Sequence, residues 1–394
     1  MFNFVYDRRN DSRPYPNLAP MMDNPHDTYH GMGDIYPFIA PLRLYHYCND
    51  HQYPMNISYT DEPLPENALY PIGLAWFDYS QDYFSMIPNQ TLEHIRQGKL
   101  TVLFYYHEGD NPYREKDRLD SLCIQHNLPT NCYKFISGNT EADKISNFIY
   151  FPDHELFYWR NGVVWNGNPR EGALAHSNIR NKKFTMLSRI HKWWRATIVT
   201  YFKQQGLLEN SYWSYNTISI GDKFEDNPIQ LSKFDGLREE LEIFLAEAPY
   251  KCDEQSTTEH NSHWMLAKHL YEDSYCSFIM ETLYDAEQSG GAFLTEKTFK
   301  AIRNGHPFVL FGCPNSLATL RRLGYRTFDA AIDNTYDSEQ NNTQRFIKTI
   351  SSVRKLLNQD LHAWYLSCLD DIIYNQNLFV GSKYDRLVEL NSKL

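Results

Sequence analysis

Strand-like and helix-like segments alternate along most of this chain, and that alternation limits the folds it can adopt. Leu100–Tyr106 is a continuous apolar run rich in β-forming residues, as expected of a strand buried on both faces of a sheet. Helix-like segments precede and follow it. Because neighbouring parallel strands need a crossover that is usually a helix, this order predicts an α/β fold with parallel, doubly wound sheets.

The alternation stops once and then restarts, which predicts two Rossmann-like domains facing a cleft. The chain has 394 residues, and a domain commonly holds about 100–200 residues. A Gly-, Asn- and Pro-rich break at Asn161–Gly172 is the predicted boundary. The expected division is 1–66 as an aromatic-rich segment of loops and short elements packed on the first domain, then 67–175 and 176–365 as the two domains.

Three segments carry specific predictions for secondary structure. Phe148–Trp159 has the apolar, aromatic content of a strand. Ile190–Gln205 has apolar residues on one helical face and is predicted to be a long helix. From Phe346 onward the pattern is mostly helical.

Composition excludes several classes of protein. Lys and Arg number 38 against 49 Asp and Glu, a net charge of −11, so the chain as a whole is not built to coat nucleic acid or anionic membrane. Its 7 cysteines lack CxxC spacing, which indicates reduced thiols in a cytosol-like compartment. No apolar run approaches the ~20 residues that span a bilayer, and the N-terminus has no signal-like apolar core.

One local zone is basic in this acidic chain. Between Arg160 and Lys203 there are nine Lys or Arg residues and one acid, Glu171. Three interpretations stay open: a solvated helix face, a site for a small polyanion such as a diphosphate, and a nucleic-acid track.

Glu296 and Lys297 occupy the first turn of a predicted helix, Thr295–Asn304, that follows a strand. First-turn N–H groups and their partial positive charge attract anions. Lys297 could add its charge at a phosphate, and Glu296 could accept both hydroxyls of a ribose. A surface pair of Glu296 with Lys300, or an acid that merely favours the helix dipole, is the alternative.

The segment containing these residues, FLTEKTFKAIRNGHPFVLFGCP, resembles the nucleotide-sugar-binding segment of GT-B glycosyltransferases of the fucosyltransferase and exostosin type. It is similar also to glycosyltransferase-like proteins of bacteriophages and bacteria, which share TEKTFK, HPFVLFG, a run like Leu323–Phe328 and an upstream element, here KKFTMLSRIHKWWR. The resemblance covers roughly Lys182–Arg345, under half of the chain.

The resemblance implies a GT-B fold with a site for a nucleotide-diphosphate sugar and no required metal. In that site Glu296 binds the ribose and Lys297 contacts phosphate. An arginine suits a diphosphate because its planar fork binds two oxygens at once. The other implied donor-site residues are two arginines and the hydroxyl and carboxylate side chains near them: Arg189, Arg195, Thr282, Thr295 and Glu281.

A base for the acceptor hydroxyl is expected from the first domain. His107, Glu108 and Asp110 come directly after the buried strand Leu100–Tyr106, where catalytic loops commonly lie. Glu108 is the favoured base, followed by Asp110 and His107. An ordinary acidic turn before Pro112 is the alternative.

The predicted function is transfer of a sugar from a nucleotide sugar to a hydroxyl of a glycan or small molecule, without metal and with inversion. Two alternatives stay open: a phage-type DNA glycosyltransferase acting on a hydroxylated base, and a catalytically inactive module that binds a sugar or a partner. The resemblance also implies that 366–394 returns to the first domain. The expected location is the cytoplasm, that of the host cell if a phage encodes the protein, and the oligomeric state is open.

Overall fold

The computed structural model describes residues 1–7, 42–74, 77–85, 87–166, 177–219, 221, 223–252 and 268–394. These residues form two compact units, described separately below. The first unit is Met1–Leu156 with Ser382–Leu394, and the second is Phe157–Gly381. The sequence places the boundary later, after Asn161–Gly172, whereas helix α5 (Asp153–Asn166) runs from the end of the first unit through much of that break.

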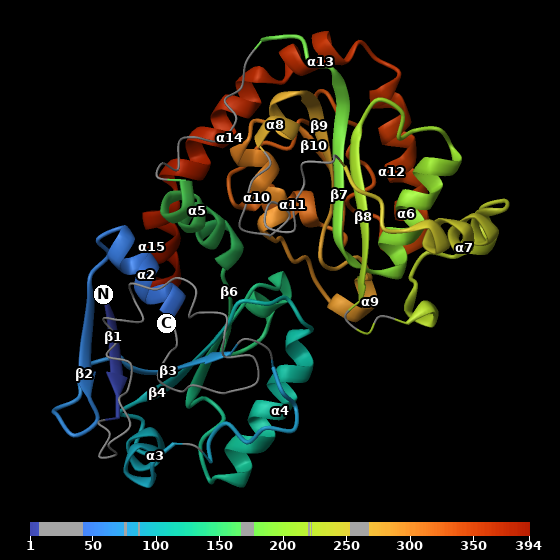
Figure 1. The fold of residues 1–394 in the computed structure, drawn as a ribbon. Helices are drawn as coiled ribbons and strands as arrows, with labels where there is room; N and C mark the ends of the chain where they lie inside the picture. Colours follow the sequence, from blue (N-terminus) through green and yellow to red (C-terminus); the bar gives the residue numbers. More distant parts are fainter. Residues whose placement is uncertain are drawn as a thin grey trace. The chain divides into compact units, whose positions relative to one another are not determined.

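The first unit is built on a parallel sheet in the order β2-β1-β3-β4-β5-β6 (Figure 1). Its strands are β1 (Phe2–Tyr6), β2 (Met55–Tyr59), β3 (Ala68–Leu74), β4 (Thr101–Tyr106), β5 (Tyr133–Ser137) and β6 (Phe148–Tyr150). The helical elements that accompany it are α2 (Leu42–Asp50), α3 (Asn89–Arg96), α4 (Pro112–Gln125), η1 (Thr140–Lys144) and α15 (Lys383–Lys393). Strand β4 is buried at all but its first residue, as predicted for a strand covered on both faces.

Strand β1 corrects the expectation for the N-terminal region. The sequence predicts loops and short surface elements over 1–66, yet β1 lies between β2 and β3 and buries Phe2, Phe4, Val5 and Tyr6. Five residues are too few to reveal a strand period, so only the neighbouring strands identify it. Residues 8–41 of that region lie outside the described residues.

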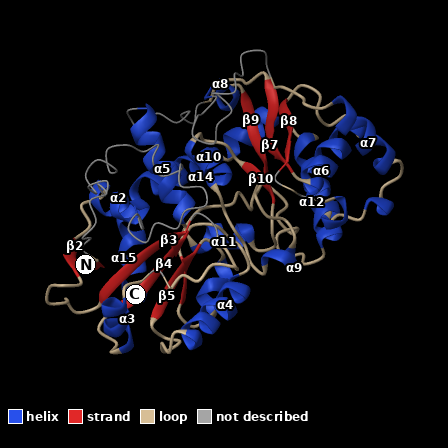
Figure 2. Cartoon of the chain, turned by 60° about the horizontal axis from the view of Figure 1, so that its bottom comes forward, coloured by secondary structure: helices blue, strands red, loops and turns tan. Residues whose placement is uncertain are grey.

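The second unit has a parallel sheet in the order β10-β9-β7-β8 (Figure 2). Its strands are β7 (Lys182–His191), β8 (Tyr212–Ser219), β9 (Ser274–Met280) and β10 (Phe308–Phe311). Figures 1 and 2 show α6 (Trp193–Gln204) and α12 (Asn342–Leu357) on one side of this sheet, and α10 (Glu296–Arg303) and α14 (Leu369–Gly381) on the other. The predicted α/β class with two doubly wound parallel sheets is confirmed.

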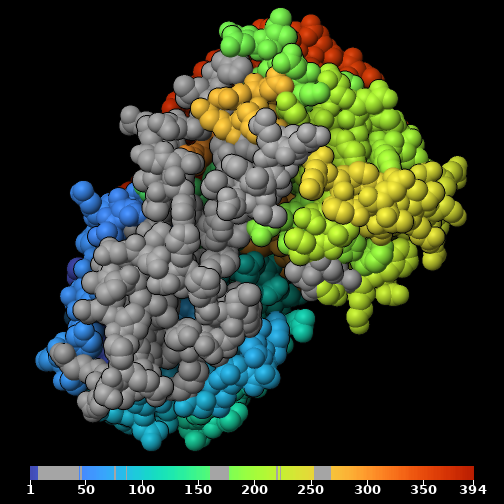
Figure 3. Space-filling model, in the orientation of Figure 1, coloured from blue at the N-terminus to red at the C-terminus, as the bar shows by residue number. Residues whose placement is uncertain are grey.

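The remaining helices of the second unit are short or lie at its margin. They are η2 (Phe224–Asp226), η3 (Leu231–Lys233), α7 (Leu237–Glu247), α8 (Lys268–Glu272), α9 (Ala286–Ser289), α11 (Ser316–Arg322) and α13 (Leu361–Ser367). Helix α7 forms the yellow margin of the space-filling view (Figure 3). It buries Leu237, Leu241 and Phe244 but leaves Ile243 exposed. Among the described residues, no helix is long and apolar enough to cross a membrane.

Two predicted segments have different bounds in the structure. The predicted strand Phe148–Trp159 is a strand only as far as Tyr150, because Pro152 cannot donate to a sheet ladder and the acids Asp153 and Glu155 favour a helix start. The predicted helix Ile190–Gln205 begins at Trp193 instead. Strand β7 continues to His191 through a register shift at Ser188/Ile190, and periodicity alone does not reveal such an irregularity.

A buried ion cluster attaches the C-terminal helix to the first unit. Lys383 Nζ lies 2.6 Å from Glu155 Oε1 and Arg386 Nε lies 3.0 Å from Glu155 Oε2. Ser382 Oγ donates to Glu155 Oε1 at 3.0 Å. The side chains of Lys383 and Glu155 are 1% and 0% exposed. One carboxylate at the start of α5 thus ties the first turn of α15 to the rest of the first unit.

Candidate functional site

The strand order of the second unit reverses between β7 and β9, and the ends of these two neighbouring strands carry the candidate site. In open α/β sheets, ligands bind outside the carboxyl ends of the strands at such a reversal. Arg195 joins the two ends: Nη1 donates to the Ile190 carbonyl at 3.1 Å and Nη2 to the Glu281 carbonyl at 2.5 Å. Arg195 is only 3% exposed, so its guanidinium lies inside the protein.

Buried Glu281, which follows β9, sets the start of α10. Its Oε1 accepts from the Thr295 amide at 3.2 Å and the Thr298 hydroxyl at 2.5 Å. Its Oε2 accepts from the Thr295 hydroxyl at 2.5 Å and the Thr282 amide at 3.2 Å. Thr295 is the N-cap of α10, and its own side chain makes no cap bond. Glu281 therefore holds the N-cap amide and the hydroxyls of Thr295 and Thr298 in place at the start of α10.

Glu296 and Lys297 lie side by side in the first turn of α10. Lys297 Nζ is 3.0 Å from Glu296 Oε1, and it lies 3.1 Å from each of the hydroxyls of Thr282 and Thr295. The side chain of Glu296 is 13% exposed and that of Lys297 is 30% exposed. Glu296 thus pairs with Lys297 in this turn, and it also acts electrostatically on Lys300. Five of the predicted donor-site residues meet here: Thr282, Glu281, Thr295, Glu296 and Lys297.

Arg189 and Lys300 add two further cations near this turn. Arg189 lies at the register shift in β7, with an exposed side chain. Lys300 is half-buried on α10. Burial lowers the pKa of Lys300 to about 8; Glu296 opposes this shift, while Lys297 and Arg189 add to it. The sequence favours Lys300 as a surface partner of Glu296 over Lys300 as a ligand, although its position three residues after Lys297 places both on one helical face.

The predicted base residues lie on the loop that follows β4 in the first unit. His107 Nε2 is 3.3 Å from Glu108 Oε1, and their side chains are 13% and 37% exposed. The Asp110 carboxylate accepts a hydrogen bond from the Tyr106 hydroxyl. Asn139 Nδ2 donates to the carbonyls of Gly109 and Asp110, at 3.0 and 3.1 Å. The backbone of this loop is therefore held in place while Glu108 stays accessible.

Glu115, on α4, is a buried acid that the sequence analysis did not single out. Its side chain is 0% exposed, and within the described residues neither carboxylate oxygen has a hydrogen-bond partner. Burial raises the pKa of Glu115 to about 9; Asp110 adds to the shift and Arg114 opposes it. Glu115 is thus neutral at pH 7, next to a loop that carries candidate catalytic acids.

Replacing Glu115 with Met is expected to stabilise the protein above neutral pH. In the folded protein the pKa of Glu115 is raised from 4.5 to about 9. As the pH rises, the unfolded chain therefore loses the Glu115 proton before the folded chain does. The free energy of unfolding of the wild type accordingly falls as the pH rises from about 4.5 to about 9. Removing a buried carboxyl without hydrogen-bond partners should gain about 1–3 kcal/mol at pH 8. Calorimetric melting at pH 5 to 9 measures this gain. Asp117→Asn, on the exposed face of α4, is the control, and a Met variant as pH-sensitive as wild type contradicts the prediction.

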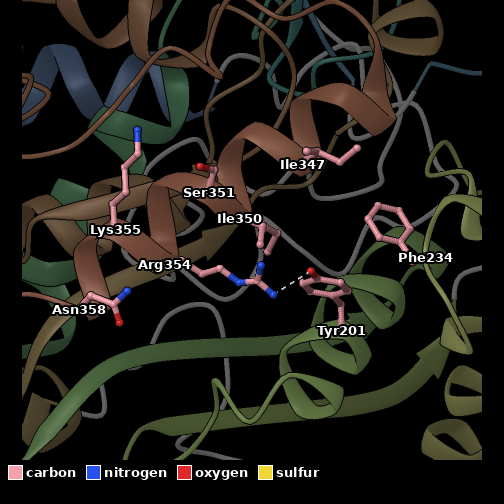
Figure 4. A pocket seen from close by; sticks show the side chains of 8 residues that line it. All are labelled: Tyr201, Phe234, Ile347, Ile350, Ser351, Arg354, Lys355 and Asn358. Carbon is pink, nitrogen blue, oxygen red and sulfur yellow. Dashed lines mark hydrogen bonds between the residues drawn. The ribbon is translucent and has the colours of Figure 1, made fainter.

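A separate hollow of about 330 Å³ lies between α6 and α12 and contains none of the predicted site residues. Tyr201, Phe234 and Ile350 give it an apolar wall, and Arg354 donates to the Tyr201 hydroxyl at 3.1 Å (Figure 4). Arg354 also donates to Gln205 Oε1 at 2.7 Å, so its guanidinium is engaged within the protein.

In the part of the chain that the structure describes, no three or more His, Cys, Asp or Glu side chains come together to hold a metal ion.

No protein-family model and no curated protein matches the chain. Among solved structures it is similar to an α1,3-fucosyltransferase at 8% identity and a TM-score of 0.31, over 98% of this chain and 90% of that one. It is also similar to an α,α-trehalose-phosphate synthase (UDP-forming) from Burkholderia vietnamiensis at 14% identity and a TM-score of 0.34, over 89% of this chain and 77% of the other. Both TM-scores lie below 0.5, so neither likeness establishes the function of this chain.

Proposed function

We propose that this protein is a glycosyltransferase whose second unit binds a nucleotide-diphosphate sugar where β7 and β9 end. The observation that carries the proposal is the first turn of α10, where Glu281 sets the helix start and Lys297 lies 3.1 Å from the hydroxyls of Thr282 and Thr295. A helix N-terminus attracts an anion, and a lysine held in the same turn adds a full charge. The sequence resemblance to donor-binding segments supports the same assignment.

The charged residues divide the work of donor binding. Lys297 contacts a phosphate oxygen, and Arg189 approaches from β7 as a second cation for the diphosphate. Glu296 accepts the ribose hydroxyls, which requires its carboxylate to share its hydrogen bonds between Lys297 and the ligand. Buried Arg195 acts indirectly, because it holds the ends of β7 and β9 together through two backbone carbonyls.

Transfer requires stabilisation of the negative charge on the departing diphosphate and removal of the proton from the acceptor hydroxyl. The acceptor oxygen bonds to the anomeric carbon while the bond from that carbon to the diphosphate breaks, and the diphosphate leaves with the electron pair. Fixed cations and the N-terminus of α10 stabilise this departing charge. Glu108 takes the acceptor proton, with His107 beside it, and Asp110 is the next candidate. Inversion, independence from metal, and a glycan or small-molecule acceptor belong to the same proposal.

Donor binding is expected to depend on Glu296 and Lys297. In a thermal-shift panel of UDP-, GDP-, CMP- and dTDP-sugars, one nucleotide family should stabilise the wild type, by about 2.7 kcal/mol at 100 times its Kd. Glu296→Ala and Lys297→Ala should each weaken that donor about 10–100-fold, because each removes a charged hydrogen-bonding group. Titration calorimetry measures the affinities.

Lys348→Ala is the matched control, since Lys348 forms an exposed 2.6 Å pair with Glu339 on the same unit and should leave donor affinity unchanged. Circular dichroism checks that every variant is folded. Equal donor affinity in the wild type and both site variants would exclude this site. If no nucleotide shifts the wild-type melting temperature, the inactive binding module becomes the better assignment.

A further inference from the structure

We propose that Lys300 is a third cationic ligand of the donor's phosphates, beside Lys297 and Arg189, and that it takes up a proton when the donor binds. The inference rests on the proposed function and goes further, because it makes donor affinity depend on pH through one named side chain. It also changes the role of Lys300 from the surface partner of Glu296 that the sequence favours to a ligand.

The position of Lys300 on α10 supports a role at the site. The helix buries Thr298, Phe299, Ala301 and Ile302, whereas Glu296, Lys297 and Lys300 are all half-buried. Residues three and four positions apart are neighbours on a helix surface, so Lys300 lies one turn along the same face. Its ammonium therefore extends the charged surface that begins at the helix N-terminus.

The charged groups around Lys300 leave an excess of positive charge. Glu296 and Lys297 act on it from α10 and Arg189 acts on it from β7. Helix α14 packs against α10 and contributes an uncharged side chain there, Gln376, which donates to the Arg303 carbonyl. On α5, the Tyr158 hydroxyl lies within electrostatic reach of Glu296 and Arg303. Among the described residues, one carboxylate and two cations thus act on Lys300.

The one nearby carboxylate is already engaged. Glu296 Oε1 lies 3.0 Å from Lys297 Nζ, whereas within the described ranges the structure assigns no hydrogen-bond acceptor to the Lys300 ammonium. A half-buried cation without an acceptor is unfavourable until an anion arrives. Burial and the two neighbouring cations accordingly lower the pKa of Lys300 to about 8. A bound diphosphate supplies the missing negative charge.

The sign of the pH effect follows from this balance. In the free protein, Lys300 loses its proton as the pH rises through about 8. In the complex the phosphates favour the ammonium and raise its pKa, so the bound state holds more protons above neutral pH. Affinity is therefore highest below about pH 7 and falls as the pH rises through 8 and beyond.

The test is titration calorimetry of GDP, UDP and inorganic pyrophosphate with the full chain from pH 6.5 to 9.5. The wild type should bind about tenfold more weakly at pH 9.5 than at pH 7, and at pH 8 should take up about half a proton, measured in buffers of different ionisation enthalpy. Lys300→Gln should bind weakly at every pH, and its affinity should not fall as the pH rises. Lys300→Arg should bind well without the slope, because arginine keeps its charge. Lys348→Gln, the surface control, should behave as wild type.

Each outcome has one meaning. If the wild type binds a probe and Lys300→Gln binds it with the same affinity and the same pH dependence, the role of Lys300 is overturned. The proposed function then still stands. Absence of binding by wild type for every probe overturns the proposed function, and this inference with it. If Lys300→Gln does not fold, the test uses Lys300→Arg and the proton uptake of the wild type. Affinity of Lys300→Arg that still falls with rising pH, or absence of proton uptake by the wild type at pH 8, overturns the inference.

Discussion

Replacing Glu108 with Gln is expected to lower the rate of sugar transfer by about 10²–10⁴-fold, the usual contribution of a general base. The amide keeps the size of the side chain but cannot take the acceptor proton. Donor affinity should stay unchanged, because the donor is assigned to the second unit. Transfer is followed by release of the nucleoside diphosphate with the donor identified in the panel, and donor affinity by calorimetry.

One further variant and one control make this result specific. Glu93→Gln, on α3 of the same unit, alters an exposed acid that pairs with Arg96 at 3.2 Å and should leave transfer unchanged. Asp110→Asn tests the next candidate, whose carboxylate accepts from the Tyr106 hydroxyl. Unchanged turnover in Glu108→Gln would remove Glu108 as the base, and loss of turnover in Asp110→Asn alone would assign the role to Asp110.

Replacing Glu155 with Ala is expected to lower the free energy of unfolding of the first unit by about 3–5 kcal/mol, the usual cost of removing one partner of a buried ion pair. Lys383, 1% exposed, would then lose its 2.6 Å carboxylate partner, and Arg386 would lose a 3.0 Å bond. Urea unfolding followed by hydrogen exchange of α15 and β1 measures the change, since exchange reports the unit separately.

The matched control for the buried cluster is an exposed pair on the same helix. Glu389, 56% exposed, lies 3.1 Å from Lys393, and Glu389→Ala should cost less than about 1 kcal/mol. The double variant Glu155→Met, Lys383→Met should recover much of the lost stability, because it removes the unpaired buried charge. A Glu155→Ala variant as stable as Glu389→Ala would show that the cluster contributes little.

Much of the fold was predictable because it is encoded locally. The apolar run that became β4 and the Thr-Glu-Lys start of α10 each contain their own signal within a few residues. The predictions were wrong where local signals were short or mixed, as in the five-residue β1 and in the segment after Pro152, where a strand gives way to α5. In both places, the neighbouring elements decide the structure.

The site shows the same division between local and tertiary information. The sequence by itself determined the alternation of strands and helices and the placement of Glu296 and Lys297 in one helical turn, because both depend on residues a few positions apart. Only the tertiary structure decided that Glu281 sets that turn from 14 residues away and that Arg195 joins the ends of two strands. It also decided the neutral state of Glu115 and the lowered pKa of Lys300. Burial and the approach of charges distant in sequence determine protonation, and neither exists until the chain is folded.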